Sequence, residues 1–570
     1  MSRIIRLDTQ LSQAFYRPGE TVRLTVHIES QVDGPVPARL SAALTHRADV
    51  IAQVQKDITL SGGQTSIELT WDPPLASPRG YGVDLRLESE AGDLLAATAT
   101  AFDVLDRWTQ APRYGFLTDF SPGRSDAAET MEALTRYHVN SLQFYDWMYR
   151  HEQFLTGQEP YRDPLGRELS RATVDALIAA AHERGIAAMP YTAIYGASVA
   201  FYREHPDWAL RGPDGKPIFF GDDFLVIMDP RPGSAWAHHL LDQFGQILRR
   251  TAFDGIHLDQ YGEPKAGYDA AGVQFPLDAA LATFIEETRA CVDSLRPEGA
   301  VVFNAVNNWP IESVAPAAQD LVYIEVWPPH TGFGDLHRLI VEGQARGGGK
   351  PVVLAAYIDP AFEHNVRLAD AVIFASGGGH IELGERHRML ADAYFPRCGT
   401  MSPSLAEVMR RYYDFAVRYQ ELIGPATRAG SLESIDFRSL EDFGSLNVWP
   451  IVREDEDFTA ISLINLTGIE PAEWGRRLES PPKVLGPARL QFTTDRKVSR
   501  IWLASPDADD PSAQPLEQWC PTSRPHPLTP SPGALGEGAK GVRGRDGQWA
   551  VEIPLLEYWD LVVIEWADSL

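Results

Sequence analysis

Two acidic residues end apolar runs that have the length of buried strands. Asp259 follows the run Phe253–Leu258, and Glu325 follows the run 321–324. Cleaving a glycosidic bond with retained configuration needs two carboxyl groups about 5–5.5 Å apart, one ionised and one protonated. Asp259 and Glu325 are about two strand–helix repeats apart, so one strand would lie between them and their side chains can converge. Asp254 has the opposite strand parity and is better explained as a turn residue.

Aromatic and polar residues gather at the same strand ends. Sugar rings pack their C–H faces on aromatic rings, while their hydroxyls bind carboxylates and amides. We therefore expect a carbohydrate site and name as substrate-binding candidates Asp119, Tyr145, Asp146, Trp147, Tyr195, His257, Gln260, Asn304, Trp327, Tyr357 and Glu382. No metal site and no cofactor is expected, since no dedicated His/Asp ligand cluster stands out. The glycine-rich segments at 347–349 and 377–379 lack phosphate-loop spacing and predict turns.

An alternation of strand-like and helix-like segments must position these residues. It predicts eight parallel strands, at Tyr114–Phe120, Ser141–Met148, Ala187–Tyr195, Gly255–Gln260, Val301–Val306, Leu321–Trp327, Pro351–Asp359 and Val372–Leu383. Helices are predicted at Ala127–Tyr137, Arg171–Arg184, Ala235–Arg250, Ala279–Arg296 and Leu336–Arg346. This pattern and size are typical of a (β/α)₈ barrel of the α/β class, with catalytic groups at the carboxyl ends of the strands. A doubly wound open sheet is the alternative.

Short alternating runs flank the barrel on both sides. We predict an N-terminal β-sandwich over 1–108, the barrel over 109–424 and a C-terminal antiparallel β domain over 425–570. A Pro- and Gly-rich stretch near 505–548 predicts a disordered insertion in the last domain. The long loop at 196–234 has turn residues typical of a small hairpin that could overhang the site.

Composition narrows the class of partner. The formal net charge is −27, which argues against nucleic acid because a phosphate backbone needs clustered Lys and Arg. Three scattered cysteines suggest neither disulfides nor a zinc site. Because no signal peptide or long apolar stretch is visible, we expect a cytoplasmic protein without a membrane partner.

Five segments together resemble glycoside hydrolase family 66, the dextranases and cycloisomaltooligosaccharide glucanotransferases. They are 143–151, 163–167, 253–263, 323–328 and 380–385 with Tyr394-Phe395-Pro396. The resemblance implies an immunoglobulin-like N-terminal domain, a barrel and a C-terminal Greek-key domain. It also implies that Asp259 is the nucleophile, that Glu325 is the general acid/base, and that the substrate is an α-1,6-linked glucan or isomaltooligosaccharide cut endolytically with retention.

The chain departs from the family pattern at three points. It shows no secretion signal, its fourth-strand motif continues as Gln260-Tyr261-Gly262-Glu263-Pro264, and it has no room for the extra module typical of the glucanotransferases. These features favour hydrolysis of short isomaltooligosaccharides. The alternatives are a transglycosylase on the same scaffold, a non-catalytic carbohydrate-binding protein, and a barrel isomerase or aldolase. The last would need a metal cluster or a strand-end lysine.

Overall fold

The computed structural model describes residues 5–567 except 33, 73–74, 222–223, 270–271, 440–445 and 520–546. Its central element is an eight-stranded parallel sheet in the order β22-β21-β20-β19-β16-β12-β9-β8. The strands are β8 (Tyr114–Leu117), β9 (Ser141–Phe144), β12 (Ala187–Ala193), β16 (Gly255–Asp259), β19 (Ala300–Val306), β20 (Leu321–Glu325), β21 (Val352–Ala355) and β22 (Gly378–His380). The Phe116 amide donates to the Leu383 carbonyl at 3.0 Å and so nearly closes the sheet into a barrel. The predicted fold class is confirmed.

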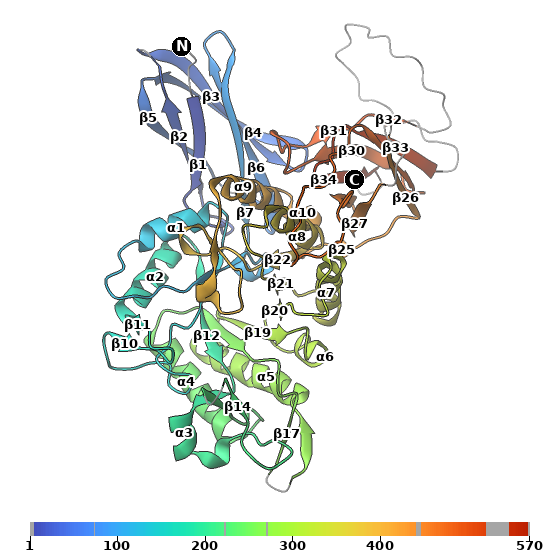
Figure 1. The fold of residues 1–570 in the computed structure, drawn as a ribbon. Coiled ribbons are helices and arrows are strands. Elements are labelled where there is room, and N and C mark those ends of the chain that lie inside the picture. The colour runs from blue at the N-terminus through green and yellow to red at the C-terminus, as the bar shows by residue number, and fades with distance from the viewer. Residues whose placement is uncertain are drawn as a thin grey trace.

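Amphipathic helices cover the outside of the barrel (Figure 1). In α4 (Ala235–Arg250), the buried residues recur every three or four positions, and the Ser234 hydroxyl caps the helix by accepting from the Ala237 amide at 3.0 Å. The other helices are α1 (Ala127–Thr135), α2 (Arg171–Glu183), α3 (Val199–Glu204), α5 (Asp278–Leu295), α6 (Ile311–Val314), α7 (Phe333–Arg346), α8 (Glu363–Ala375), α9 (Pro403–Arg418) and α10 (Gln420–Ile423). In the described part of the chain, no helix is both long enough and apolar enough to span a membrane.

The eighth predicted strand is wrong in its first half. Residues 372–375 are the last turn of α8, and the strand is only Gly378–His380. The run from Ala371 to Ala375 is buried on every side, so it has no polar stripe. A short apolar run of this kind cannot be assigned to helix or strand by periodicity.

Small sheets in the loops surround the carboxyl ends of the strands. The loop after β12 forms a three-stranded sheet of β13 (Gly196–Ser198), β15 (Leu225–Ile227) and β14 (Phe219–Phe220), where the sequence predicted a hairpin. The two-stranded sheets are β10 (Tyr161–Arg162) with β11 (Glu168–Leu169), β17 (Ala266–Tyr268) with β18 (Gln274–Pro276), and β23 (Arg388–Met389) with β24 (Gly399–Thr400).

Two antiparallel β domains flank the barrel and lie near α9 and α10 (Figure 1). The N-terminal domain has two sheets. The strands of the first are, in order, β1 (Ile5–Leu11), β2 (Val22–Ser30) and β5 (Gly63–Trp71), and those of the second are β4 (Asp49–Leu60), β3 (Val36–His46), β6 (Arg79–Ser89) and β7 (Leu94–Val104). The C-terminal domain also has two sheets. The strands of the first are, in order, β25 (Arg428–Ala429), β27 (Val448–Glu454), β28 (Phe458–Asn465), β34 (Trp559–Trp566), β30 (Val498–Ala504) and β31 (Gln514–Pro515). Those of the second are β26 (Ser434–Ser439), β29 (Ala488–Thr493), β33 (Gln548–Ile553) and β32 (Gln518–Trp519). Most of the predicted disordered insertion, 520–546, lies outside the described residues.

Gly255 begins β16 at a place where the backbone of β19 leaves no space. A Cβ at this position would lie 1.9 Å from the Ala300 carbonyl oxygen, and the residue has φ +155°. We therefore expect Gly255→Ala to lower the free energy of unfolding by about 2–4 kcal/mol, because the two strands must separate. Denaturant unfolding measures this. Gly334→Ala, where nothing lies within 4 Å of the added Cβ, is the control and should change stability by well under about 1 kcal/mol.

Candidate active site

The two candidate catalytic carboxyls lie at the ends of β16 and β20, with β19 between them. Asp259 is the last residue of β16, and Glu325 is the last residue of β20. β19 pairs with both strands, and Val306 lies opposite Glu325 in its register. Both side chains therefore reach the same end of the barrel from either side of one strand.

Asn304, on the intervening strand β19, holds the two carboxylates together. Its side-chain nitrogen donates to Asp259 Oδ1 at 2.7 Å and to Glu325 Oε2 at 2.8 Å. Because both oxygens bind one nitrogen, they cannot be more than about 5.5 Å apart. This is within the separation that a glycosidase with a carboxylate nucleophile requires.

Further donors fix the outer oxygens of the pair. The Tyr191 hydroxyl donates to Asp259 Oδ2 at 2.8 Å. Glu325 Oε1 accepts from the Tyr357 hydroxyl at 2.8 Å and from the Trp327 indole at 2.9 Å. With Asn304, these contacts give both carboxyls a fixed orientation.

The electrostatics of the pair favour one ionised carboxyl at a time. Burial raises the pKa of Asp259, and the nearby charge of Glu325 raises it further. Burial also raises the pKa of Glu325, while its hydrogen bonds from Asn304, Tyr357 and Trp327 oppose the rise. Two carboxyls this close do not ionise together easily, so over a range of pH one is charged and the other protonated.

The pair opens into a pocket of about 620 Å³ with a largely aromatic wall. Of the substrate-binding candidates, the pocket is lined by Tyr145, Asp146, Gln260, Asn304, Trp327 and Tyr357. Burial raises the pKa of Asp146 to about 7, although the Arg167 charge lowers it. The flat walls and the central acids suit a sugar chain.

Three other candidates lie behind or beneath the pocket wall and do not line the pocket. The Trp147 indole is buried, donates to the Tyr191 carbonyl at 3.2 Å and packs on Phe253. The buried Tyr195 hydroxyl donates to Gln260 Oε1 at 3.1 Å. His257 lies inside the barrel next to the Tyr114 hydroxyl at 2.9 Å, where burial lowers its pKa to about 3.

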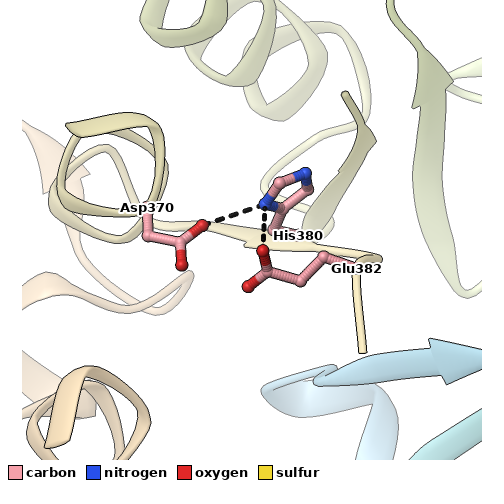
Figure 2. A group of neighbouring side chains, drawn as sticks. All are labelled: Asp370, His380 and Glu382. Atoms are coloured by element: carbon pink, nitrogen blue, oxygen red, sulfur yellow. Dashed lines mark hydrogen bonds and ion pairs between the residues drawn. The ribbon is translucent and has the colours of Figure 1, made fainter. Parts of the chain in front are cut away.

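Glu382 is also absent from the pocket. It is fully buried beside His380 and Asp370 (Figure 2). The Tyr413 hydroxyl donates to its Oε1 at 2.9 Å. The expectation that Glu382 binds substrate does not agree with this position. The residue belongs instead to a separate cluster behind β22.

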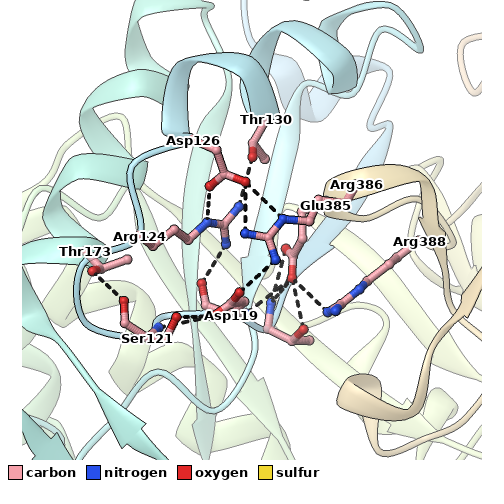
Figure 3. Close-up of polar contacts among 10 residues, drawn as sticks. Asp119, Ser121, Arg124, Asp126, Thr130, Thr173, Glu385, Arg386 and Arg388 are labelled. Carbon is pink, nitrogen blue, oxygen red and sulfur yellow. Dashed lines mark hydrogen bonds and ion pairs between the residues drawn. The ribbon is translucent and has the colours of Figure 1, made fainter.

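Asp119 takes part in an ionic network at the barrel seam rather than in the pocket (Figure 3). Arg386 binds Asp119 at 3.0 Å and Asp126 at 2.9 Å. The buried Glu385 accepts from the Thr118 hydroxyl at 3.0 Å and from the Asp119 amide at 3.2 Å. These contacts join the loop after β22 to the loop after β8, so the role of Asp119 in the structure is to close the barrel.

Several residues that line the pocket were not predicted from the sequence to bind substrate. Tyr191 lies two positions before Ala193, which pairs with Asp259, so strand alternation could have identified it. Other lining residues lie in loops, where strand periodicity gives no signal. Four of them, His151, Tyr261, Tyr394 and Phe395, belong to the segments that resemble the family; the others include Phe220, Phe224, Lys265 and Asn307. Phe220 stacks on Tyr261 with ring centroids 4.5 Å apart and forms one rim.

A parallel barrel with two carboxyls across one sugar-sized gap is the arrangement of retaining glycosidases. The chain belongs to glycosyl hydrolase family 66, whose sequence profile matches residues 11–523. The predicted family is thus confirmed.

Individual relatives are distant. A cycloisomaltooligosaccharide glucanotransferase of Niallia circulans is 24% identical over an alignment covering 97% of this chain and 71% of the relative. A dextranase of Streptococcus salivarius is 22% identical over 76% of this chain and 62% of that protein. A crystal structure of a Paenibacillus sp. cycloisomaltooligosaccharide glucanotransferase complexed with cycloisomaltoheptaose superimposes with a TM-score of 0.86 at 22% identity, covering 97% of this chain and 99% of the other.

Proposed function

We propose that this chain cleaves α-1,6-linked glucose chains with retained configuration, through a covalent glucosyl-enzyme on Asp259. The observation that carries the proposal is the Asn304 amide, which places both carboxylate oxygens within 2.8 Å of one nitrogen. The names of the relatives support the α-1,6-glucan substrate.

In the first step, ionised Asp259 attacks the anomeric carbon while the proton of Glu325 passes to the departing glycosidic oxygen. Forming the ester removes the charge of Asp259. Glu325, now ionised, takes the proton of an incoming hydroxyl, whose oxygen attacks the anomeric carbon and releases Asp259 as a carboxylate. Two displacements at one carbon retain its configuration.

The incoming hydroxyl decides between transfer and hydrolysis. The glucanotransferase relatives match 97% of this chain and the dextranase 76%, which supports transfer to a sugar hydroxyl more strongly than the hydrolysis favoured by the sequence. Hydrolysis is the second candidate, because this chain lacks part of the first glucanotransferase relative. The alignment with the first relative extends over 717 positions, so that relative contains well over a hundred residues that this 570-residue chain lacks.

Incubation with isomaltooligosaccharides tests the retained configuration, the linkage that is cleaved and the choice between transfer and hydrolysis. We expect α-configured products at first appearance by NMR, and no cleavage of α-1,4-linked maltooligosaccharides of equal length. Raising the oligosaccharide concentration should increase transfer products, cyclic or longer than the substrate, relative to reducing ends. A β-configured first product, or cleavage of the α-1,4 series alone, would contradict the proposal.

Tyr357 provides a test of the proton donor through pH dependence. Its hydroxyl hydrogen bond stabilises ionised Glu325 and so lowers the pKa of that carboxyl. Tyr357→Phe should therefore raise this pKa and move the basic limb of the kcat/KM profile to higher pH, because the acid keeps its proton longer. Tyr145→Phe is the matched control, since that hydroxyl donates to the Ala393 carbonyl. A basic limb moved to lower pH in Tyr357→Phe would exclude Glu325 as the donor.

A further inference from the structure

A second cluster of ionisable groups lies behind β22, outside the pocket of Asp259 and Glu325. Asp370 comes from α8, while His380 and Glu382 lie at the end of β22 and just beyond it. Their side chains have no exposed surface. One potential ligand atom from each lies within 4.8 Å of the others (Figure 2).

The two nitrogens of the His380 ring have different partners. Nε2 lies 2.9 Å from the Ala356 carbonyl oxygen, which can only accept, so Nε2 carries a hydrogen. Nδ1 faces two carboxylates, with Asp370 Oδ1 at 2.9 Å and Glu382 Oε2 at 3.2 Å. A neutral ring would then direct a bare lone pair at two negative groups, so something positive must lie at Nδ1.

A single hydrogen on Nδ1 does not satisfy this cluster. It would point to Asp370, and Glu382 Oε2 and Asp370 Oδ2 are both without a hydrogen-bond donor. Among the described residues, neither carboxylate has an ion pair with an arginine or a lysine. With both carboxyls ionised, one imidazolium therefore leaves a net negative charge in this buried cluster, which is costly and must be offset by a second proton or by a cation. A divalent cation with a neutral ring would balance it.

We propose that Asp370, His380 and Glu382 bind one divalent transition-metal ion, with Zn²⁺ as the best match. One imidazole and two carboxylates form a ligand set that Zn²⁺ accepts, with bonds of about 2.0–2.2 Å. At such bond lengths the ligand atoms need to move apart by only a few tenths of an ångström. The surroundings also suit a metal site, because a metal-bound histidine commonly donates its other N–H to a carbonyl, and Ala356 provides one.

The ion would connect the core to the active site through the segment that follows β21. Ala356 precedes Tyr357, whose hydroxyl binds Glu325. On the other side, Tyr413 of α9 donates to Glu382 Oε1 and fixes the direction of Oε2. The ion would thus hold α8, β22 and α9 together and would position the backbone that carries Tyr357.

Metal content of the intact chain tests the proposal. Protein is produced without a metal-binding tag in medium supplemented with Zn²⁺ or Mn²⁺, and then analysed by inductively coupled plasma mass spectrometry. We expect about one equivalent of metal per chain, and anomalous scattering at the metal edge between the three side chains in a crystal. Removal by a chelator should lower the unfolding temperature by several degrees, and added Zn²⁺ should restore it.

Two variants separate metal binding from general stability. Asp370→Asn should reduce the bound metal to below about a tenth of an equivalent. His138→Gln is the matched control, because it disrupts another buried His–carboxylate pair, with Asp414 at 2.8 Å, and should keep the full equivalent. Wild-type protein without metal under both conditions, with an unfolding temperature that Zn²⁺ does not change, would overturn the proposal in favour of a proton. Full metal content in Asp370→Asn would overturn it as well. If that variant does not fold, the wild-type measurements decide.

Discussion

Asp259→Gly should lower kcat/KM for isomaltooligosaccharides by about 10⁴-fold or more, since removing a nucleophile eliminates the covalent route. Azide should then restore glucosyl transfer. The glycine leaves space beside the anomeric carbon, and Asn304 and Tyr191, which bind the lost carboxylate at 2.7 and 2.8 Å, remain to hold a small anion there. NMR of the product measures the outcome.

The stereochemistry of the azide product separates the two carboxyls. In Asp259→Gly the azide attacks once from the side of the lost nucleophile, so a β-glucosyl azide is expected from an α-linked substrate. In Glu325→Ala the azide instead intercepts the glucosyl-enzyme, so the product should be the α-glucosyl azide. An α product from Asp259→Gly, or activity close to that of the wild type, would exclude Asp259 as the nucleophile.

The strands that carry the chemistry could be predicted because their sequence signal is local. Apolar runs that end in Asp259 and Glu325 gave the strand ends, and strand alternation gave Asn304 a place on the strand between them. The bridging role of Asn304 could not be predicted, because it depends on the register between three strands.

Trp147 and His257 were predicted to bind substrate, but neither lines the pocket, and the physical reasons differ. Asp146 has a left-handed backbone, with φ +53°, which reverses the alternation and turns Trp147 back onto Phe253. His257 does point into the barrel, as alternation predicted. Asp259 lies one layer above it, so Asp259 lines the pocket and His257 does not. Neither the backbone reversal nor the depth of a layer can be seen in residue order.

The cluster behind β22 was hidden for a third reason. Asp370 belongs to α8, a helix that the sequence analysis did not separate from the following strand. Its contact with His380 and Glu382 therefore needs a helix-to-strand turn that periodicity did not indicate. A ligand set spread over such a turn does not resemble a compact metal motif, and the expectation of no metal site rested on the lack of one.

Glu325→Ala should lower activity by an amount that depends on the leaving group. A sugar leaves as a poor alkoxide and needs the proton of Glu325, so kcat/KM for isomaltooligosaccharides should fall by about 10²–10⁴-fold. The dinitrophenolate of a dinitrophenyl α-isomaltoside leaves without a proton, so kcat/KM for this substrate should change little. Its kcat should fall, because the glucosyl-enzyme loses the base that its second step needs. Pre-steady-state bursts of dinitrophenol measure this accumulation.

A carboxyl at the same pocket provides the control for this dependence. Glu263 also lines the pocket, but its side chain is 74% exposed and lies 3.7 Å from Lys265. Glu263→Gln should therefore affect both substrates equally, because this side chain is exposed to solvent and pairs with Lys265 at 3.7 Å. Equal losses for the two substrates in Glu325→Ala would mean that this carboxyl binds the sugar without transferring a proton. The general acid would then have to be sought among the other carboxyls lining the pocket, beginning with Asp146, whose pKa burial raises to about 7.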